Sequence, residues 1–351
     1  TYQHDAEGNI SRITYPDGTS ESFVYNSDRV VTGYTDRNGN SVRYTVDGKG
    51  SVLSYTDGRG NTTTFSYDGM GNRTSMTDPA GAVTSYTYDK QGNRLSETDA
   101  LGNTTRYVYD GQGRLTKVTC SDGSTAEYAY TEAGKLVKTT DAMGSVQTYT
   151  VDGNGFNTSE SDWMGNITTY IRNTQNQVTS VTDPLGNKST YSYDDRGNLS
   201  VQTDANGNSV TYTYDAAGRM VSMTDGMGNT WTYSYNNESQ VTSVTDPMGG
   251  VTRTAYDETG RTQSVTNARG NTTSYTYDGV GNTVAVRDAS GKSTKNVYDA
   301  NGNLISTTDR NGAVTQYEYD KNNRLTKVAD ALGGETTYTY DDLNRRTSES
   351  D

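Results

Sequence analysis

The chain has 351 residues, a net charge of −13 and a sequence pI near 4.6. This acidic balance argues against nucleic acid as the main partner, because binding to phosphates needs a basic surface. No apolar run approaches the roughly 18 residues of a membrane-spanning helix, and the single cysteine excludes an intrachain disulfide. Leu, Ile, Val and Phe make up only about 13% of the chain, which is typical of disorder. However, 29 tyrosines at regular positions supply apolar mass, so we expect a folded protein.

A phrase of 21 residues, YxYDxxGxLxxVTDxxGNTTx, recurs about 16.7 times without insertion or deletion. Stepping by 21 from Asp5 to Asp341 gives seventeen positions, of which thirteen are Asp and three are Asn. A second series, from Tyr15 to Asp351, holds fourteen aspartates, and each of its first sixteen members is followed three residues later by Gly. Such self-similarity indicates a repeat architecture. We therefore expect one continuous array over residues 1–351, as a fragment of a longer protein or a segment of a filament.

Each repeat contains two stretches with strand character. In the first, Thr105, Tyr107 and Tyr109 share one face and alternate with residues of the other face, which is the pattern of a half-buried strand. In the second, the apolar residues Leu115 and Val118 are three apart. This spacing breaks strict alternation and predicts a β-bulge in the second strand. No segment has helical periodicity of useful length.

Two D-x-x-G turns separate the stretches. We call those of the Asp5 series first turns and those of the Tyr15 series second turns. Asp at the first position can accept hydrogen bonds from backbone amides ahead of it, and Gly at the fourth adopts a positive φ easily. This code is typical of hairpin connections. Of the five first turns without Gly, three have Asn, which tolerates the left-handed region, whereas Arg29 and Ser239 do not fit. The second position of the second turn requires a φ near −65°, which proline provides. All four prolines occupy this position: Pro16, Pro79, Pro184 and Pro247.

These elements predict an all-β protein with roughly 33 antiparallel strands of about six or seven residues in one long sheet. A sheet this wide cannot stay flat and open, and no helices are predicted to cover it. We therefore expect the sheet to curl until its tyrosine face is buried, forming a hollow shell or tube.

The repeated phrase, as in Tyr109, Asp110, Gly113, Arg114 and Leu115, resembles the YD repeats of Rhs proteins. The resemblance extends to the C components of insecticidal toxin complexes and to teneurins, and it covers essentially the whole chain. It implies one β-sheet that spirals into a hollow shell. In the bacterial members such a shell holds a toxic C-terminal domain, and in teneurins it forms part of a cell-surface adhesion protein.

Bacterial shells of this family usually close with a core whose aspartates cleave the chain near a DPxG segment. Three DPxG segments occur here, at residues 78–81, 183–186 and 246–249. All three are in phase with the repeat and lead into ordinary strands, so we interpret them as second turns. The self-cleaving activity is not transferred to any residue of this chain.

No catalytic, cofactor-binding or metal-binding residue is predicted. The only histidine, His4, replaces a repeat tyrosine, and Cys120 occupies a turn position usually held by Asp. Neither residue indicates a nucleophile or a metal site. The turn carboxylates are expected to bond to backbone amides and not to form acid–base pairs. Calcium held by the stacked Asp and Asn turns stays an open alternative, and no cofactor is predicted.

The sequence favours a structural function, an Rhs-like shell wall or tube that encloses or displays a toxin or other effector domain without catalysis of its own. The alternative is an extracellular binding or adhesion module whose aromatic side chains contact carbohydrate or cell-surface ligands. Buried tyrosines favour the wall, and solvent-facing rows of tyrosine favour binding. We expect a secreted or cell-surface protein of bacterial origin. A repeat array without polar caps leaves open sheet edges, so its partners are expected to be a flanking effector domain or copies of itself joined end to end. No nucleic acid partner and no membrane span are expected.

Overall fold

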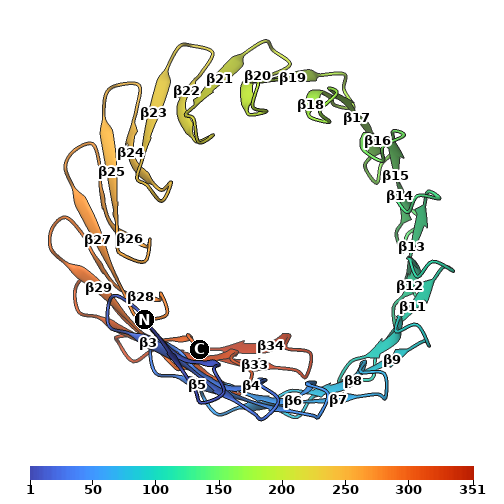
Figure 1. The fold of residues 1–351 in the computed structure, drawn as a ribbon, viewed down its shortest axis with the longest axis vertical. Coiled ribbons are helices and arrows are strands. Elements are labelled where there is room, and N and C mark those ends of the chain that lie inside the picture. The colour runs from blue at the N-terminus through green and yellow to red at the C-terminus, as the bar shows by residue number, and fades with distance from the viewer. The chain divides into compact units, whose positions relative to one another are not determined.

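The computed structural model describes all 351 residues, and its regular elements are 34 β-strands joined by turns. The residues form two compact units. Unit 1 comprises Thr1–Thr104, Ala255–Thr266 and Gly270–Asp351, and unit 2 comprises Thr105–Thr254 and Asn267–Arg269. Within each unit, hairpins follow one another in chain order (Figure 1). None of the elements is a helix long and apolar enough to cross a bilayer.

The strands of unit 1 have the following bounds: β1 (Tyr2–His4), β2 (Ile10–Thr14), β3 (Ser20–Tyr25), β4 (Val31–Thr35), β5 (Ser41–Val46), β6 (Val52–Thr56), β7 (Thr62–Tyr67), β8 (Arg73–Thr77), β9 (Val83–Tyr88), β10 (Arg94–Thr98), β26 (Thr262–Thr266), β27 (Thr272–Tyr277), β28 (Thr283–Arg287), β29 (Ser293–Tyr298), β30 (Leu304–Thr308), β31 (Val314–Tyr319), β32 (Leu325–Ala329), β33 (Glu335–Tyr340) and β34 (Arg346–Ser350). The strands wholly or mostly in unit 2 are β11 (Thr104–Tyr109), β12 (Leu115–Thr119), β13 (Thr125–Tyr130), β14 (Leu136–Thr140), β15 (Val146–Val151), β16 (Asn157–Ser161), β17 (Ile167–Arg172), β18 (Val178–Thr182), β19 (Lys188–Tyr193), β20 (Leu199–Thr203), β21 (Ser209–Tyr214), β22 (Met220–Thr224), β23 (Thr230–Tyr235), β24 (Val241–Thr245) and β25 (Val251–Tyr256).

Strands that are neighbours in sequence pair antiparallel, as β11 does with β12 and β12 with β13. The strands belong to a 34-stranded sheet. Its two ends do not close on each other, because β1 pairs with β2 and β34 pairs with β33. The predicted all-β meander is confirmed, with strands of five or six residues apart from the three-residue β1.

The turns have the geometry that their code predicts. In the second turn that begins at Asp183, the carboxylate Oδ1 accepts hydrogen bonds from the amides of Leu185 (2.9 Å) and Asn187 (2.8 Å). Gly186 donates its amide to the Asp183 carbonyl and has a φ of +86°. Turn geometry persists even where the fourth residue is not Gly, because all five such residues have φ between 60° and 64°: Arg29, Asn176, Ser239, Asn323 and Asn344.

The predicted bulge is present and explains the recurring tyrosine. Tyr109 pairs with Leu115 but Val108 pairs with Lys117, so one extra residue of β12 is inserted into the ladder. A bulge leaves backbone groups without their usual ladder partners. The Tyr130 hydroxyl, one repeat later, donates to the Leu115 carbonyl at 2.8 Å. The same bond, over a separation of 15 residues, recurs in at least eleven repeats and ties each hairpin to the next.

Four repeats add an arginine that links neighbouring repeats. Arg219 donates from Nε to the Asp215 carboxylate at 2.7 Å and from Nη1 to the Asn236 carbonyl of the next repeat at 3.1 Å. Its guanidinium also lies over the Tyr235 ring, 4.8 Å from the centroid. The three other repeats with this arrangement contain Arg114, Arg261 and Arg324.

The tyrosine face is half-buried and not buried, which corrects the expectation of a covered aromatic face. First strands alternate between exposed and half-buried residues, as in β19. Of the 29 tyrosines, 27 are half-buried, and Tyr86 is the one fully buried hydrophobic residue. The rings are covered by neighbours on the same face of the sheet, because no second layer of helices or strands packs on them.

Candidate functional site: the seam between two rows of turns

Unit 1 brings second turns of its N-terminal part against first turns of its C-terminal part. The facing turns begin at Asp36 and Asp278, at Asp57 and Asp299, and at Asp78 and Asp320, and each pair is 242 residues apart (278 minus 36, 299 minus 57, 320 minus 78). We call this contact the seam. Its constant spacing follows from the repeat, because two rows of turns with the same period stay matched along their length.

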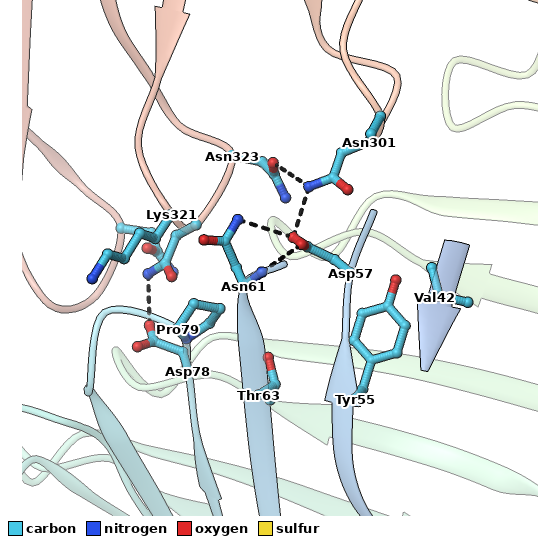
Figure 2. A pocket seen from close by; sticks show the side chains of 13 residues that line it. Val42, Tyr55, Asp57, Asn61, Thr63, Asp78, Pro79, Asn301, Lys321 and Asn323 are labelled. Atoms are coloured by element: carbon cyan, nitrogen blue, oxygen red, sulfur yellow. Dashed lines mark hydrogen bonds between the residues drawn. The ribbon is translucent and has the colours of Figure 1, made fainter. Parts of the chain in front are cut away.

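Asparagine side chains make one bond across the seam at each of the three turn pairs. Asn301 donates to Asp57 Oδ2 at 2.7 Å (Figure 2), and Asn322 donates to Asp78 Oδ2 at the same distance. At the third turn pair the roles are reversed, since Asn38 donates to Asp278 Oδ2 at 2.9 Å. The seam is therefore held by charge-assisted hydrogen bonds between carboxylates and amides.

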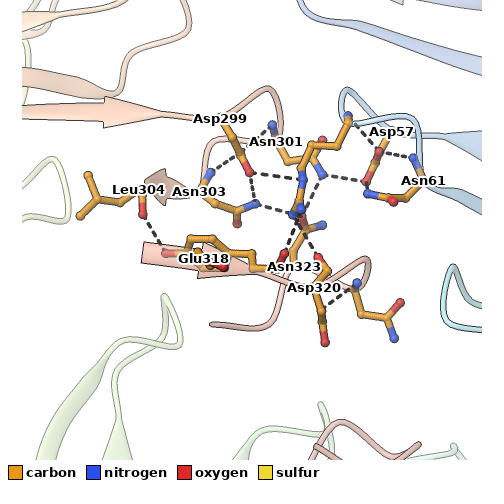
Figure 3. A network of polar contacts seen from close by, with 12 residues as sticks. Asp57, Asn61, Asp299, Asn301, Asn303, Leu304, Glu318, Asp320 and Asn323 are labelled. Carbon is orange, nitrogen blue, oxygen red and sulfur yellow. Dashed lines mark hydrogen bonds and ion pairs between the residues drawn. The ribbon is translucent and has the colours of Figure 1, made fainter. Parts of the chain in front are cut away.

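Arg59, at the third position of its second turn, connects with two facing turns. It donates from Nη1 to the Asp320 carbonyl (3.0 Å) and from Nη2 to the Tyr319 carbonyl (3.0 Å). Nη1 also donates to Asn323 Oδ1 at 3.1 Å, and Nε lies 3.5 Å from the Asp299 carboxylate. Figure 3 shows that these groups form one network with Asn301 and Asp57.

The backbones of the facing turns approach so closely that glycine is required at two positions. A Cβ added at Gly58 would lie 2.5 Å from the Ala300 carbonyl oxygen, and one at Gly279 would lie 2.7 Å from the Arg37 carbonyl oxygen. Gly111, at the position in its first turn that corresponds to Gly279, has open space there. The need for glycine at the seam therefore comes from the close approach and not from the turn itself.

Two of the seam aspartates, Asp57 and Asp278, have a pKa below that of an ordinary carboxyl. Burial raises the pKa of Asp57, but the backbone amide of Asn61 and the side chain of Asn301 lower it further, so the pKa lies below its usual value. Asp278 behaves in the same way, with burial opposed by the side chains of Asn282 and Asn38. These ionised carboxylates are the acceptors that hold the seam together.

A cavity of about 490 Å³ lies within the seam (Figure 2). Tyr55, Asp57 and Asp78 line it from one side, and Asn301 and Asn322 from the other. Part of its wall consists of groups that bond to each other, such as Asp57 with Asn301 and Asp78 with Asn322. The Asn322 side-chain oxygen is buried without a hydrogen-bond partner in the protein.

The residues considered for chemistry in the sequence lie apart from one another. His4 is in the edge strand β1, and Cys120 is an exposed thiol in a second turn. The three DPxG segments are second turns, as interpreted. No group of three or more His, Cys, Asp or Glu side chains is arranged to hold a metal ion. The seam residues were not predicted, because their partners lie 240 or more residues away.

The RHS Repeat family matches ten segments that together span residues 46–125, 172–293 and 298–351. The chain belongs to the RHS repeat family. No curated protein matches the sequence. The matched model describes a repeat, and it indicates no catalytic family.

Solved structures share the fold of this RHS repeat chain. The crystal structure of TcdB2-TccC3-Cdc42 matches with a TM-score of 0.77 and 16% identity over 99% of this chain. The crystal structure of TcdB2-TccC3 matches with a TM-score of 0.76 and 16% identity, also over 99%. The Photorhabdus luminescens Tc holotoxin pore matches with a TM-score of 0.74 and 16% identity over 99%. This chain covers 24% or 25% of those chains, about a quarter of their length.

Proposed function

We propose that this chain is part of the wall of an Rhs-type shell that encloses or displays a toxin or other effector domain and has no catalysis of its own. The observation that carries this proposal is the agreement of fold with TcdB2-TccC3-Cdc42 over 99% of the chain at a TM-score of 0.77. Membership of the RHS repeat family supports it from the sequence side.

The structural use of the tyrosines supports a wall more than a carbohydrate-binding surface. Tyr214 and Tyr235 donate their hydroxyls to backbone carbonyls one repeat earlier. An arginine guanidinium lies over the Tyr235 ring. Ring faces and hydroxyls that are occupied in this way hold repeats together, and stacking on a sugar requires an accessible ring face.

The proposal includes partners and location. Strands β1 and β34 are the two free edges of the sheet, and unpaired edge strands are templates for further strand pairing. We therefore propose that a flanking effector domain or an adjacent copy joined end to end covers these edges. Since one similar structure is a Photorhabdus luminescens holotoxin pore, we also propose a bacterial, secreted protein.

Protease protection tests the proposal. A small protease-sensitive ribonuclease is fused after Asp351 and digested with proteinase K, beside the same ribonuclease without the chain. A wall that encloses its neighbour slows cleavage of the ribonuclease by at least about tenfold, since cleavage then follows the population of opened states.

A fusion that carries Asp57→Ala and Gly279→Ala, which open the seam, serves as the matched control and is expected to lose part of the protection. Equal cleavage rates for the free and the fused ribonuclease would overturn the enclosing function. Tight binding of the chain to a glycan array would favour the adhesion module instead.

A further inference from the structure

Five second turns of unit 2 present an exposed apolar side chain at their third position. Met143, Met164, Leu185, Met227 and Met248 are 85–96% exposed. They recur with the 21-residue period at one end of the strands, interrupted by the polar Asn206 at the same position. We call these five residues the tip row. Exposed apolar residues gathered on one edge mark an interaction surface.

A leucine also occupies this position in a second turn of unit 1 that lies next to the seam turns along the chain. Leu101 is the third residue of the second turn that begins at Asp99, and the constant spacing of 242 residues places this turn opposite the first turn at Asp341 (341 minus 99). Leu101 is 48% exposed, whereas Leu332, at the same position in another second turn, is 97% exposed. A leucine tip at the end of the seam is therefore about half as exposed as one outside it.

A second observation supports the contact between these two turns. Burial raises the pKa of Asp99, but hydrogen bonds from Asn103 and Leu101 and the charge of Arg345 lower it further, so the pKa lies below its usual value. Arg345 directly follows the first turn at Asp341. Leu343, the third residue of the same first turn, is half-buried. Apolar tips are therefore compatible with docking of a second turn onto a first turn.

Two carboxylates of unit 2 resemble the seam carboxylate that accepts a bond from a facing turn. Asp78 has Ala82 four residues later, so no amide side chain of its own turn occupies Oδ2, and Asn322 donates to that oxygen at 2.7 Å. Asp141 and Asp246 also lack an asparagine four residues later, and their Oδ1 atoms accept the amides of their own turns. Their Oδ2 atoms have the same local setting as that of Asp78.

The complementary donors lie at the other end of the strands. The first turns of unit 2 carry the exposed amide side chains Gln112, Asn154 and Gln175 at the position of Asn301 and Asn322 in the seam. We propose that the tip row docks onto the first-turn row of a second copy of this chain. Both rows have the same period, so tips and turns match over several repeats. The interface is heterologous, and such contacts build open assemblies unless a rotation closes them. This inference does not depend on the enclosing function.

Sedimentation velocity of the full chain over a range of concentrations tests the proposal. The tip variant replaces Met143, Met164, Leu185, Met227 and Met248 with Asn, the residue already present at position 206. The row variant carries Gln112→Glu, Asn154→Asp and Gln175→Glu, which place negative charge against the turn carboxylates. The native chain is expected to self-associate, and each variant to associate at least about tenfold more weakly. Circular dichroism checks that both variants keep the native strand content.

Mixing the two variants gives the decisive result. The tip variant keeps an intact first-turn row and the row variant keeps an intact tip row. Their mixture is therefore expected to form one-to-one dimers at concentrations where each variant alone is monomeric. Association through β1 and β34, or between two tip rows, would leave the mixture no more associated than its components, which would overturn the proposal. A native chain that stays monomeric at all concentrations would also overturn the proposal. This conclusion would hold whether or not the chain sediments with phosphatidylcholine vesicles.

Discussion

The second turns at Asp57 in unit 1 and at Asp183 in unit 2 have the same local geometry but different surroundings. In both, the aspartate accepts the backbone amides two and four residues later, and the fourth residue is a glycine with φ of +84° or +86°. Only the turn at Asp57 lies in the seam, where Asn301 bonds to it. The 21-residue code therefore determines the turn, and the residues at the turn tips determine what the turn contacts.

Acid is expected to have the largest effect. Hydrogen bonds lower the pKa of turn aspartates in both settings, such as Asp57 in the seam and Asp225 outside it, and the pKa of Asp288 falls to about 2 through the hydrogen bonds from Ser290 and Arg310. A carboxyl whose pKa is lower in the folded state than in the unfolded state stabilises the fold. This stability is fully present above the pKa of the unfolded state, near 4, and is lost as the pH falls through the pKa of the folded state. Urea midpoints between pH 6 and pH 2 should therefore decrease steadily below about pH 4. An unchanged midpoint at pH 2 would contradict the role of the turn carboxylates.

Removing the carboxylate that is shared across the seam is expected to cost more than removing its counterpart outside. Asp57→Ala and Asp183→Ala lose the same bonds within their turns, but Asp57→Ala also loses the bond from Asn301. Because hydrogen bonds to charged groups contribute about 1.5–3 kcal/mol, the free energy of unfolding should fall by about 2 kcal/mol more in Asp57→Ala. A double-mutant cycle with Asn301→Ala isolates this pair, and a coupling energy near zero would show that the bond contributes nothing.

Replacing glycine with alanine at the second position of a first turn should change the free energy of unfolding in opposite directions inside and outside the seam. Gly279→Ala places a Cβ within 2.9 Å of the Arg37 backbone, so the seam must shift, at an expected cost of about 1–3 kcal/mol. Gly111→Ala meets open space and should stabilise the protein by about 0.4–1 kcal/mol through the unfolded chain. Thermal unfolding of both variants checks the signs. Equal shifts would contradict the close approach of the two turn rows.

A smaller loss of stability is expected from a substitution at the left-handed residue of a turn outside the seam. Gly186→Val forces a β-branched residue to adopt a φ of +86°, at a cost of about 1–2 kcal/mol. Thr190→Val, in the neighbouring strand β19, conserves shape and strand preference and should cost little. Urea unfolding of the pair provides the test, and equal stability would rule out the turn assignment.

Much of the fold could be predicted from sequence because it depends on local chemistry. The aspartate and glycine of each turn, and the spacing of Leu115 and Val118, act within ten residues of each other, and they specify the turns and the bulge. Arg29 and Ser239 were the residues that did not fit, and the structure holds them at positive φ because the flanking strands fix the turn.

The seam could not be predicted, because its two rows of turns lie 240 or more residues apart in the sequence. The aspartates Asp57 and Asp183 occupy the same position in the repeat, and the partner of Asp57, Asn301, is 244 residues away. The asparagines at the turn tips were a usable signal, but an asparagine also occurs at position 206, outside the seam. The degree of burial of the tyrosines was overestimated for a related reason, since alternation shows which face is apolar but not whether another layer covers it.

The spacing of 242 residues between facing turns is tested most directly by distances between spin labels. In a Cys120→Ser background, labels at Ala80→Cys and Lys321→Cys probe facing turns, and labels at Ala80→Cys and Asp342→Cys probe turns one repeat out of register. A short, narrow distance distribution is expected for the first pair and a longer distance for the second, since one repeat displaces a turn by two strands, or roughly 10 Å along the seam. Equal distances, or a broad distribution for both pairs, would contradict the seam.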